Sequence, residues 1–201
     1  MVTIDDIELI LPSKSKKIEE LQGVILHRIK QKYGFKERII YPSYVLSSFY
    51  EQHYDDVKLQ YLVDFKNDKN EVYVFNPEYR TLARETAFQQ FSDIKNYDFY
   101  YIQKIISYDT PDRENIIEDV VIGICTVNPV DEDDAWDQLC TCAKEVLKGI
   151  EFNNTSFNDS FNNSIKLYVK GKKVAFGKKE SEKGFMSIHF SINDILKSIE
   201  K

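Results

Sequence analysis

The densest group of chemically active side chains in the sequence is the acidic run Asp131–Asp134. Carboxylate oxygens are ligands that divalent cations prefer, so this run could hold a metal ion. The run has no EF-hand spacing, however, and it directly precedes a segment with helical periodicity. We therefore interpret it as the first turn of a helix, where acidic side chains oppose the helix dipole favourably. No metal site is predicted.

The histidines, glycines and cysteines show none of the spacings that define common catalytic sites. His27, His53 and His189 lie in three different predicted elements, so we interpret them as surface or core residues; a site built from distant residues stays open. The glycines are scattered singly, which excludes the familiar phosphate-binding loops, and no cofactor is predicted. The odd number of cysteines, without a C-x-x-C motif, predicts neither a disulfide framework nor a zinc site. These cysteines are Cys125, Cys140 and Cys142.

Hydrophobic periodicity predicts a long amphipathic helix near the N-terminus. Apolar residues recur at spacings of three and four, which places them on one face of the helix. Ser13 or Ser15 is the expected N-cap, and Gly34 is the expected C-terminal stop. A strand over Phe35–Tyr41, ended by Pro42, is predicted to follow directly. The apolar residues of this helical face are Ile18, Leu21, Ile25, Ile29 and Tyr33.

The rest of the chain alternates between β-rich runs and helical segments. Two long β-rich runs, Asp98–Tyr108 and Ile116–Val127, are joined by a turn-forming segment. The stretch Asn153–Ser164 is rich in Asn and Ser and is predicted to be a loop. The sequence thus predicts one α+β domain over residues 1–201, with helices flanking a mainly antiparallel sheet. The other predicted elements are a helical turn at Val45–Tyr50, a hairpin of Gln60–Phe65 and Glu71–Phe75, helices at Pro77–Phe91, Asp131–Phe152 and Ile192–Ile199, a hairpin at Ile165–Gly177 and a strand at Phe185–Phe190.

Composition agrees with a globular domain. Of the 201 residues, 42% are hydrophobic, and 13 Tyr and 13 Phe supply large surfaces for a core. The net charge of −6 argues against a nonspecific nucleic-acid-binding protein, which usually has a basic surplus. No apolar run approaches the ~20 residues of a membrane span, and acids precede the first apolar run, the reverse of a secretory signal. We therefore expect a cytoplasmic protein.

Four segments, in their order along the chain, resemble the catalytic domain of class II aminoacyl-tRNA synthetases, most closely the histidyl-tRNA synthetase group. The first, Ile10–Pro42, is similar to motif 1, in which a long helix runs through a Gly-Phe turn into a strand that ends in Pro. In that family motif 1 forms the homodimer interface, within a six- to seven-stranded antiparallel sheet. The resemblance therefore implies a homodimer. Its expected interface residues are Gly34, Phe35, Ile39 and Pro42.

Two further segments, in the middle of the chain, also resemble this family. The segment around Glu78 is similar to the family's Arg-Pro-Glu-Gly-Thr sequence, with Pro77 and Glu78 at matching positions. In the family this glutamate contacts the amino group of the substrate amino acid. The segment Asp98–Pro129 resembles motif 2, two antiparallel strands around a loop, with Tyr101 and Gly123 at matching positions.

The arginines that bind ATP in this family do not match. The motif 2 pattern Phe-Arg-x-Glu is replaced by Ile-Ser-Tyr-Asp, so Ser107 stands where an arginine contacts the α-phosphate. The C-terminal strand and helix resemble motif 3, but Asp194 stands near the position of its arginine. Adenylate formation requires preorganised cations at the α-phosphate, which arginine supplies well. The resemblance therefore implies a synthetase-like domain without catalytic residues, unless Lys104 or Arg113 approaches from a nearby position.

We expect a homodimeric, non-catalytic protein that acts as a regulatory, small-ligand-binding or interaction subunit. Its pocket is expected to be lined by Glu78, Tyr101, Ser107 and Asp109. Two of these residues are acids, so an amine-bearing ligand suits the pocket better than a nucleotide.

Two other hypotheses stay open. An active adenylate-forming or aminoacyl ligase would need cations from Lys104, Arg113 or a partner subunit. A tRNA-binding accessory factor would use the basic cluster of the C-terminal hairpin, although lysines on a hairpin edge also prevent edge-to-edge aggregation. That cluster consists of Lys170, Lys172, Lys173, Lys178 and Lys179.

Overall fold

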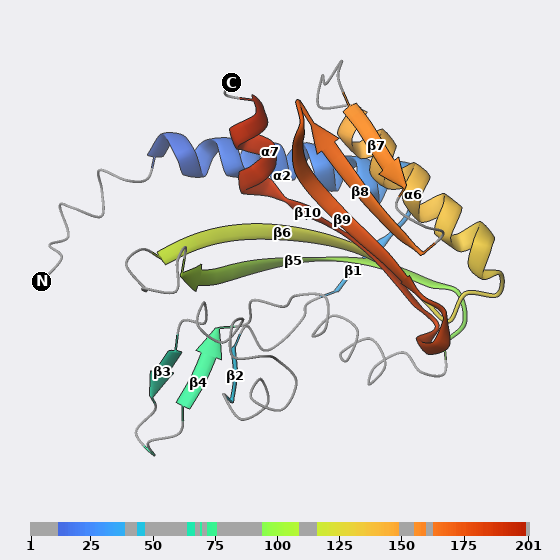
Figure 1. Cartoon of the computed structure of the whole chain (residues 1–201), viewed down its shortest axis with the longest axis horizontal. Helices are drawn as coiled ribbons and strands as arrows, with labels where there is room; N and C mark the ends of the chain where they lie inside the picture. Colours follow the sequence, from blue (N-terminus) through green and yellow to red (C-terminus); the bar gives the residue numbers. More distant parts are fainter. Residues whose placement is uncertain are drawn as a thin grey trace, which may run out of the picture.

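A seven-stranded sheet forms the centre of the protein (Figure 1). The structure, a computed structural model, describes residues 12–38, 44–46, 64–66, 69, 72–75, 94–108, 116–148, 155–159 and 163–199. Helices α2, α6 and α7 lie on one side of this sheet, and a second, three-stranded sheet lies on the other side of β5 and β6. This arrangement confirms the predicted α+β class and the mainly antiparallel sheet of six to seven strands.

The two long strands of the sheet are neighbours. Strands β5 (Tyr97–Tyr108) and β6 (Ile116–Val127) pair antiparallel over their whole length. Only β1 (Lys36–Glu37) pairs parallel among the described strands of this sheet, and it lies beside β5 at one end of the strand order. The order from that end is β1, β5, β6, β10 (Phe185–Ser191), β9 (Lys172–Glu180), β8 (Ser164–Val169) and β7 (Thr155–Asp159).

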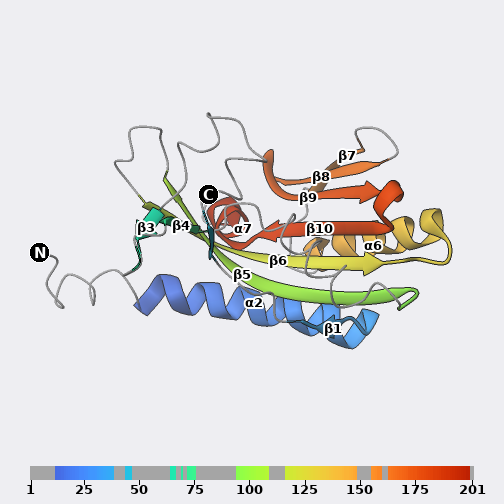
Figure 2. The same cartoon turned by 90° about the horizontal axis from the view of Figure 1, so that it is seen from below.

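Helix α2 (Pro12–Tyr33) runs along β5 (Figure 2). It begins before both serines that were expected to cap it, so the prediction of Ser13 or Ser15 as N-cap is wrong. A proline in the first turn is well tolerated because its missing N–H would have no partner there. The helix ends as predicted: Gly34 has a φ of +70°, and its N–H donates to the carbonyl oxygen of Lys30 at 3.1 Å.

Helices α6 (Glu132–Lys148) and α7 (Ile192–Ile199) complete the layer on this side of the sheet. Asp131 caps α6, since its Oδ1 accepts hydrogen bonds from the N–H groups of Asp133 and Asp134 at 3.0 Å each. This finding agrees with the interpretation of the acidic run as a helix start. Among the described helices, none is both long and apolar enough to cross a membrane.

The main core lies between this helical layer and the sheet. Leu21, Ile25 and Ile29 of α2 are buried there, as their periodicity predicted. They contact one face of the sheet and the buried sides of α6 and α7. The sheet face that they cover carries Tyr100, Ile122, Ile124, Met186, Ile188 and Phe190.

Two predicted elements differ from the structure. Val45–Tyr50 was expected to be a helical turn, but Tyr44–Leu46 forms β2, an edge strand of the three-stranded sheet with β4 (Val72–Phe75) and β3 (Asp64–Lys66). The Asn-rich stretch was expected to be a loop throughout, but its residues Thr155–Asp159 form β7, paired with β8. Thr155–Asp159 forms a strand because its backbone pairs with that of β8. Its polar residues are compatible with a position at the edge of a sheet. The predicted helix Pro77–Phe91 lies outside the described residues.

Candidate functional site

The sheet face opposite the helices carries the residues that the motif 2 resemblance singles out. Tyr101 is fully buried, and its ring lies over Gly123 on the neighbouring strand. A Cβ at position 123 would lie only 2.3 Å from Cε1 of Tyr101. His189, from β10, contacts the same ring with centroids 5.8 Å apart. The three strands therefore place Tyr101, Gly123 and His189 in one row across the sheet.

Aromatic side chains continue this face along β5. The rings of Tyr97 and Phe99 are 6.0 Å apart, and those of Phe99 and Tyr101 are 6.5 Å apart. All three residues are buried. This aromatic row is a consequence of strand alternation, which places every second residue of β5 on the same face.

Two buried polar side chains on this face have no hydrogen-bond partner within the described structure. They are the hydroxyl of Ser187, fully buried, and the side-chain amide of Gln103, which is 5% exposed. A buried polar group that stays unsatisfied costs about 1–3 kcal/mol of folding free energy. A ligand that supplied hydrogen bonds to these groups would recover part of that cost.

The four residues of the expected pocket are only partly placed by the structure. Tyr101 and Ser107 lie on the same strand, six residues apart, which corresponds to about 20 Å along β5. Glu78 and Asp109 lie outside the described residues, as do Ile39 and Pro42 of the expected interface.

The residue expected at the motif 3 arginine position belongs to an ion pair. Oδ1 of Asp194 lies 2.8 Å from Nζ of Lys172 at the start of β9. The N–H of Asp194 also bonds Oγ of Ser191, which caps α7 together with the carboxylate of Asp119. Burial raises the pKa of Asp119, and its hydrogen bonds from Ser191 and the N–H of Asn193 partly oppose that rise.

Two basic side chains lie near the sheet face opposite the helices, at the end where β5 begins. Nζ of Lys36 is 5.7 Å from the ring centre of Tyr97, and Cζ of Arg38 is 5.1 Å from it. Tyr97 begins β5, so these cations lie about 33 Å along the strand from Ser107. Lys104 is four residues after Tyr100 in β5, and alternate residues of a strand share a face. Lys104 is therefore on the same helix-covered face as Tyr100. This is the wrong face to replace the motif 2 arginine.

The five lysines of the hairpin do not form one basic patch, which corrects the sequence prediction. Lys178 is exposed, whereas Lys179 is buried on the opposite face of β9. Nζ of Lys179 lies 2.6 Å from Asp133 and 3.7 Å from Glu132, and these carboxylates raise the pKa of Lys179. Lys172 is paired with Asp194. The remaining members, Lys170 and Lys173, lie near the turn, at the other end of the hairpin from Lys178.

The segment expected to form the homodimer interface follows α2. Gly34 ends the helix, and Phe35 packs partly buried against the main core. Glu37 in β1 accepts hydrogen bonds from the hydroxyl of Tyr100 at 2.7 Å and from Nζ of Lys30 at 3.0 Å. These two donors hold the pKa of Glu37 below its usual value. The contacts fix β1 at the edge of the sheet.

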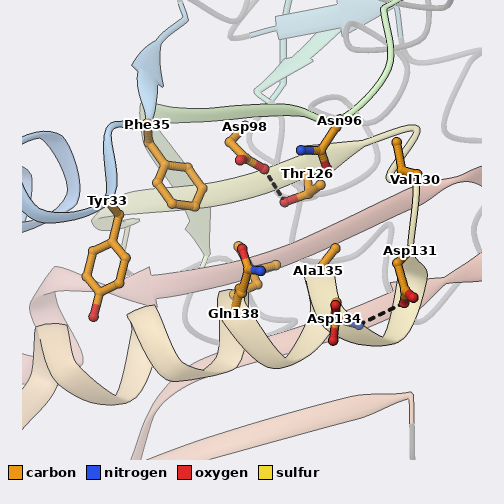
Figure 3. A pocket seen from close by; sticks show the side chains of 11 residues that line it. Tyr33, Phe35, Asn96, Asp98, Thr126, Val130, Asp131, Asp134, Ala135 and Gln138 are labelled. Carbon is orange, nitrogen blue, oxygen red and sulfur yellow. Dashed lines mark hydrogen bonds between the residues drawn. The ribbon is translucent and has the colours of Figure 1, made fainter.

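A cavity of about 230 Å³ lies on the helix-covered side, between the end of α2, the first half of α6 and the paired ends of β5 and β6 (Figure 3). Phe35 and Asp98 lie on its sheet side, and Ala135 and Gln138 of α6 lie opposite. Oδ1 of Asp98 accepts a hydrogen bond from the hydroxyl of Thr126 at 2.7 Å. No sequence pattern predicts this cavity, because it brings Tyr33 and Phe35 at the end of α2 against residues between Asn96 and Leu139, which lie much further along the chain.

Histidine, cysteine and acidic side chains do not gather into a metal site within the described structure. His189 is buried on the face opposite the helices, His27 is exposed on α2, and His53 lies outside the described residues. All three cysteines are buried.

Comparison with known proteins identifies the fold. No protein-family model and no curated protein matches the sequence. Among solved structures, a histidine–tRNA ligase subunit from Alicyclobacillus acidocaldarius superposes with a TM-score of 0.74 at 7% identity, over 94% of this chain and 94% of that one. An ATP phosphoribosyltransferase regulatory subunit/histidyl-tRNA synthetase from Bacillus halodurans gives a TM-score of 0.72 at 8% identity, over 94% and 80%.

A third similar structure extends the likeness beyond the histidyl group. The pyrrolysyl-tRNA synthetase of Desulfitobacterium hafniense superposes with a TM-score of 0.69 at 14% identity, over 91% of this chain and 69% of that one. The chain therefore has the fold of class II aminoacyl-tRNA synthetases, with histidyl-tRNA synthetase-like chains among its structural neighbours. Identities this low show the fold and leave activity to be argued from the residues.

Proposed function

We propose that the protein is a non-catalytic member of the class II synthetase fold that acts as a regulatory, small-ligand-binding or interaction subunit. One observation carries this proposal. On the face opposite the helices, the described positions of β5, β6 and β10 hold aromatic, aliphatic and neutral polar side chains and the acidic Asp119, with no lysine or arginine among them. These positions include Tyr97, Phe99, Tyr101, Gln103, Val121, Gly123, Cys125, Val127, Phe185, Ser187 and His189.

Electrostatics connects this observation to the lack of catalysis. A unit-charge contact at ~4 Å is worth about 4 kcal/mol at an effective dielectric constant of 20. The loss of one such contact to a phosphate weakens binding about a thousandfold. Lys36 and Arg38 lie at the opposite end of β5 from Ser107, so they do not compensate for its missing charge.

Two further observations support a ligand-binding or regulatory role. Ser187 and Gln103 offer buried hydrogen-bonding groups to a small polar ligand on this face. One similar structure is described as an ATP phosphoribosyltransferase regulatory subunit/histidyl-tRNA synthetase, which gives a precedent for regulation on this fold. The proposed pocket extends from Tyr101 toward Ser107, with Glu78 and Asp109 as acidic groups for an amine-bearing ligand. The proposal includes a cytoplasmic location, which suits a chain whose three cysteines do not form a disulfide framework.

Calorimetry with ATP and Mg²⁺ tests the proposal. We expect the unmodified protein to bind ATP more weakly than millimolar, because no described cation of the three strands faces the triphosphate. Ser107→Arg should strengthen binding, since it restores the family's motif 2 arginine. Ile102→Arg is the matched control: it adds the same charge to β5 at a half-exposed position on the opposite face, and should leave ATP binding weak. Micromolar ATP binding by the unmodified protein would instead favour the active-ligase hypothesis.

The proposal includes a homodimer formed through the helix and strand of Ser13–Pro42, with Gly34, Phe35, Ile39 and Pro42 at the interface. Light scattering at micromolar protein should give twice the chain mass of 23.6 kDa. Ile39→Asp should shift the mass to that of one chain, because a charged side chain is costly in an apolar interface. Circular dichroism distinguishes this dissociation from unfolding. A single-chain mass for the unmodified protein at micromolar concentration contradicts the dimer.

A further inference from the structure

The cavity beside α6 contains the carboxylate of Asp98, which forms no ion pair with the basic side chains that the structure describes. Asp98 is partly buried, and the neutral hydroxyl of Thr126 is its hydrogen-bond donor. Burial raises the pKa of Asp98, and the bond from Thr126 only partly opposes that rise. Carboxylates removed from water are normally paired with a cation, and the described residues around Asp98 supply none.

The other walls of the cavity suit an organic cation. The three charged residues that line it are all acidic: Asp98, Asp131 and Asp134. The ring of Phe35, which is held against the main core, forms part of the sheet side (Figure 3). An aromatic face attracts ammonium and guanidinium groups through its quadrupole. The amide of Gln138 adds a neutral hydrogen-bonding group on the helix side.

The size of the cavity and the arrangement of its side chains limit the kinds of ligand that it can bind. The volume of about 230 Å³ is below the ~300–1,000 Å³ of pockets that take drug-sized ligands, so a single functional group on a short stem fits better than a nucleotide. The three carboxylates do not converge into a metal-binding group. A guanidinium can both bond a carboxylate and stack on an aromatic ring.

We propose that this cavity binds the guanidinium or ammonium group of a small organic cation or of a basic side chain, with Asp98 as its counter-ion and Phe35 as its aromatic wall. The site is separate from the proposed pocket on the other face of the sheet. Asp98 and Ser107 are nine residues apart in β5, about 30 Å along the strand. The result of the ATP experiment therefore does not decide whether this cavity binds a cation.

Titration with butylguanidinium, followed by amide chemical shifts, tests the proposal. We expect saturable shifts at millimolar concentrations, centred on residues around the cavity. Butylurea has nearly the same shape without the charge, and it should bind at least about tenfold more weakly, because a hydrogen bond to a charged group is worth about 1.5–3 kcal/mol. No saturation with butylguanidinium, or equal binding of butylurea, overturns the proposal.

A matched pair of aspartate variants assigns the counter-ion. Asp98→Asn removes the charge but keeps an oxygen that accepts the hydrogen bond from Thr126, so the fold should be retained and butylguanidinium should bind at least about tenfold more weakly. Asp137→Asn removes an exposed charge of α6 that does not line the cavity, and should leave binding unchanged. Equal binding by Asp98→Asn and the unmodified protein overturns the assignment.

A second measurement separates the two sources of the cation. If the occupant is a basic side chain of a second copy of the chain, saturating butylguanidinium should weaken self-association in sedimentation experiments. If it is a free small cation, self-association should stay unchanged. Either result keeps Asp98 as the counter-ion and identifies where its partner comes from.

Discussion

Replacement of Gly123 by valine should lower the free energy of unfolding by about 3 kcal/mol, the upper end of the usual cost of overpacking a core. The cause is the ring of Tyr101. A Cβ at position 123 would lie 2.3 Å from Cε1 and 2.5 Å from Cζ of that ring, closer than real atoms approach. The ring is fully buried between Phe99 and His189, so it has no solvent-exposed space to enter.

Thermal or denaturant unfolding measures this effect. For a domain of this length, a loss of about 3 kcal/mol corresponds to a fall in Tm of roughly 10 °C. Gly23→Ala is the matched control, because no atom lies within 4 Å of the added methyl group in the middle of α2. That change should stabilise the protein by about 0.5–1 kcal/mol through better helix propensity.

A double mutant identifies Tyr101 as the cause. Tyr101→Ala opens the space that the valine needs, so Gly123→Val should cost at least about 1 kcal/mol less in that background than in the unmodified protein. Equal costs in both backgrounds, or a single variant within about 0.5 kcal/mol of the unmodified protein, would contradict the described packing.

Features that depend on local sequence were predicted well. The spacing of Leu21, Ile25 and Ile29 identified the buried face of α2, because helical period alone decides which residues share a face. Gly34 marked the helix end for an equally local reason, its freedom to adopt a positive φ. The order of segments predicted the sheet and its class II synthetase-like fold, which the structural comparisons confirm.

Features that depend on distant contacts were missed. Thr155–Asp159 has no strong strand signal, and it is a strand because β8 offers it a backbone edge. The basic cluster was treated as one surface, although alternation along β9 separates Lys178 from Lys179, and α6 supplies acids to the latter. Asp98 and Phe35 are far apart in sequence, so no spacing pattern predicts that they share a cavity.

Amino-acid-dependent exchange of pyrophosphate into ATP tests the central claim most directly, because it measures adenylate formation itself. Exchange requires cations that stabilise charge developing on the α-phosphate. Ser107 replaces the motif 2 arginine, and Asp194 is engaged with Lys172 near the motif 3 position. We predict no exchange above background with any of the twenty amino acids. Robust exchange with even one of them, by the unmodified protein, would contradict the account and establish an active ligase.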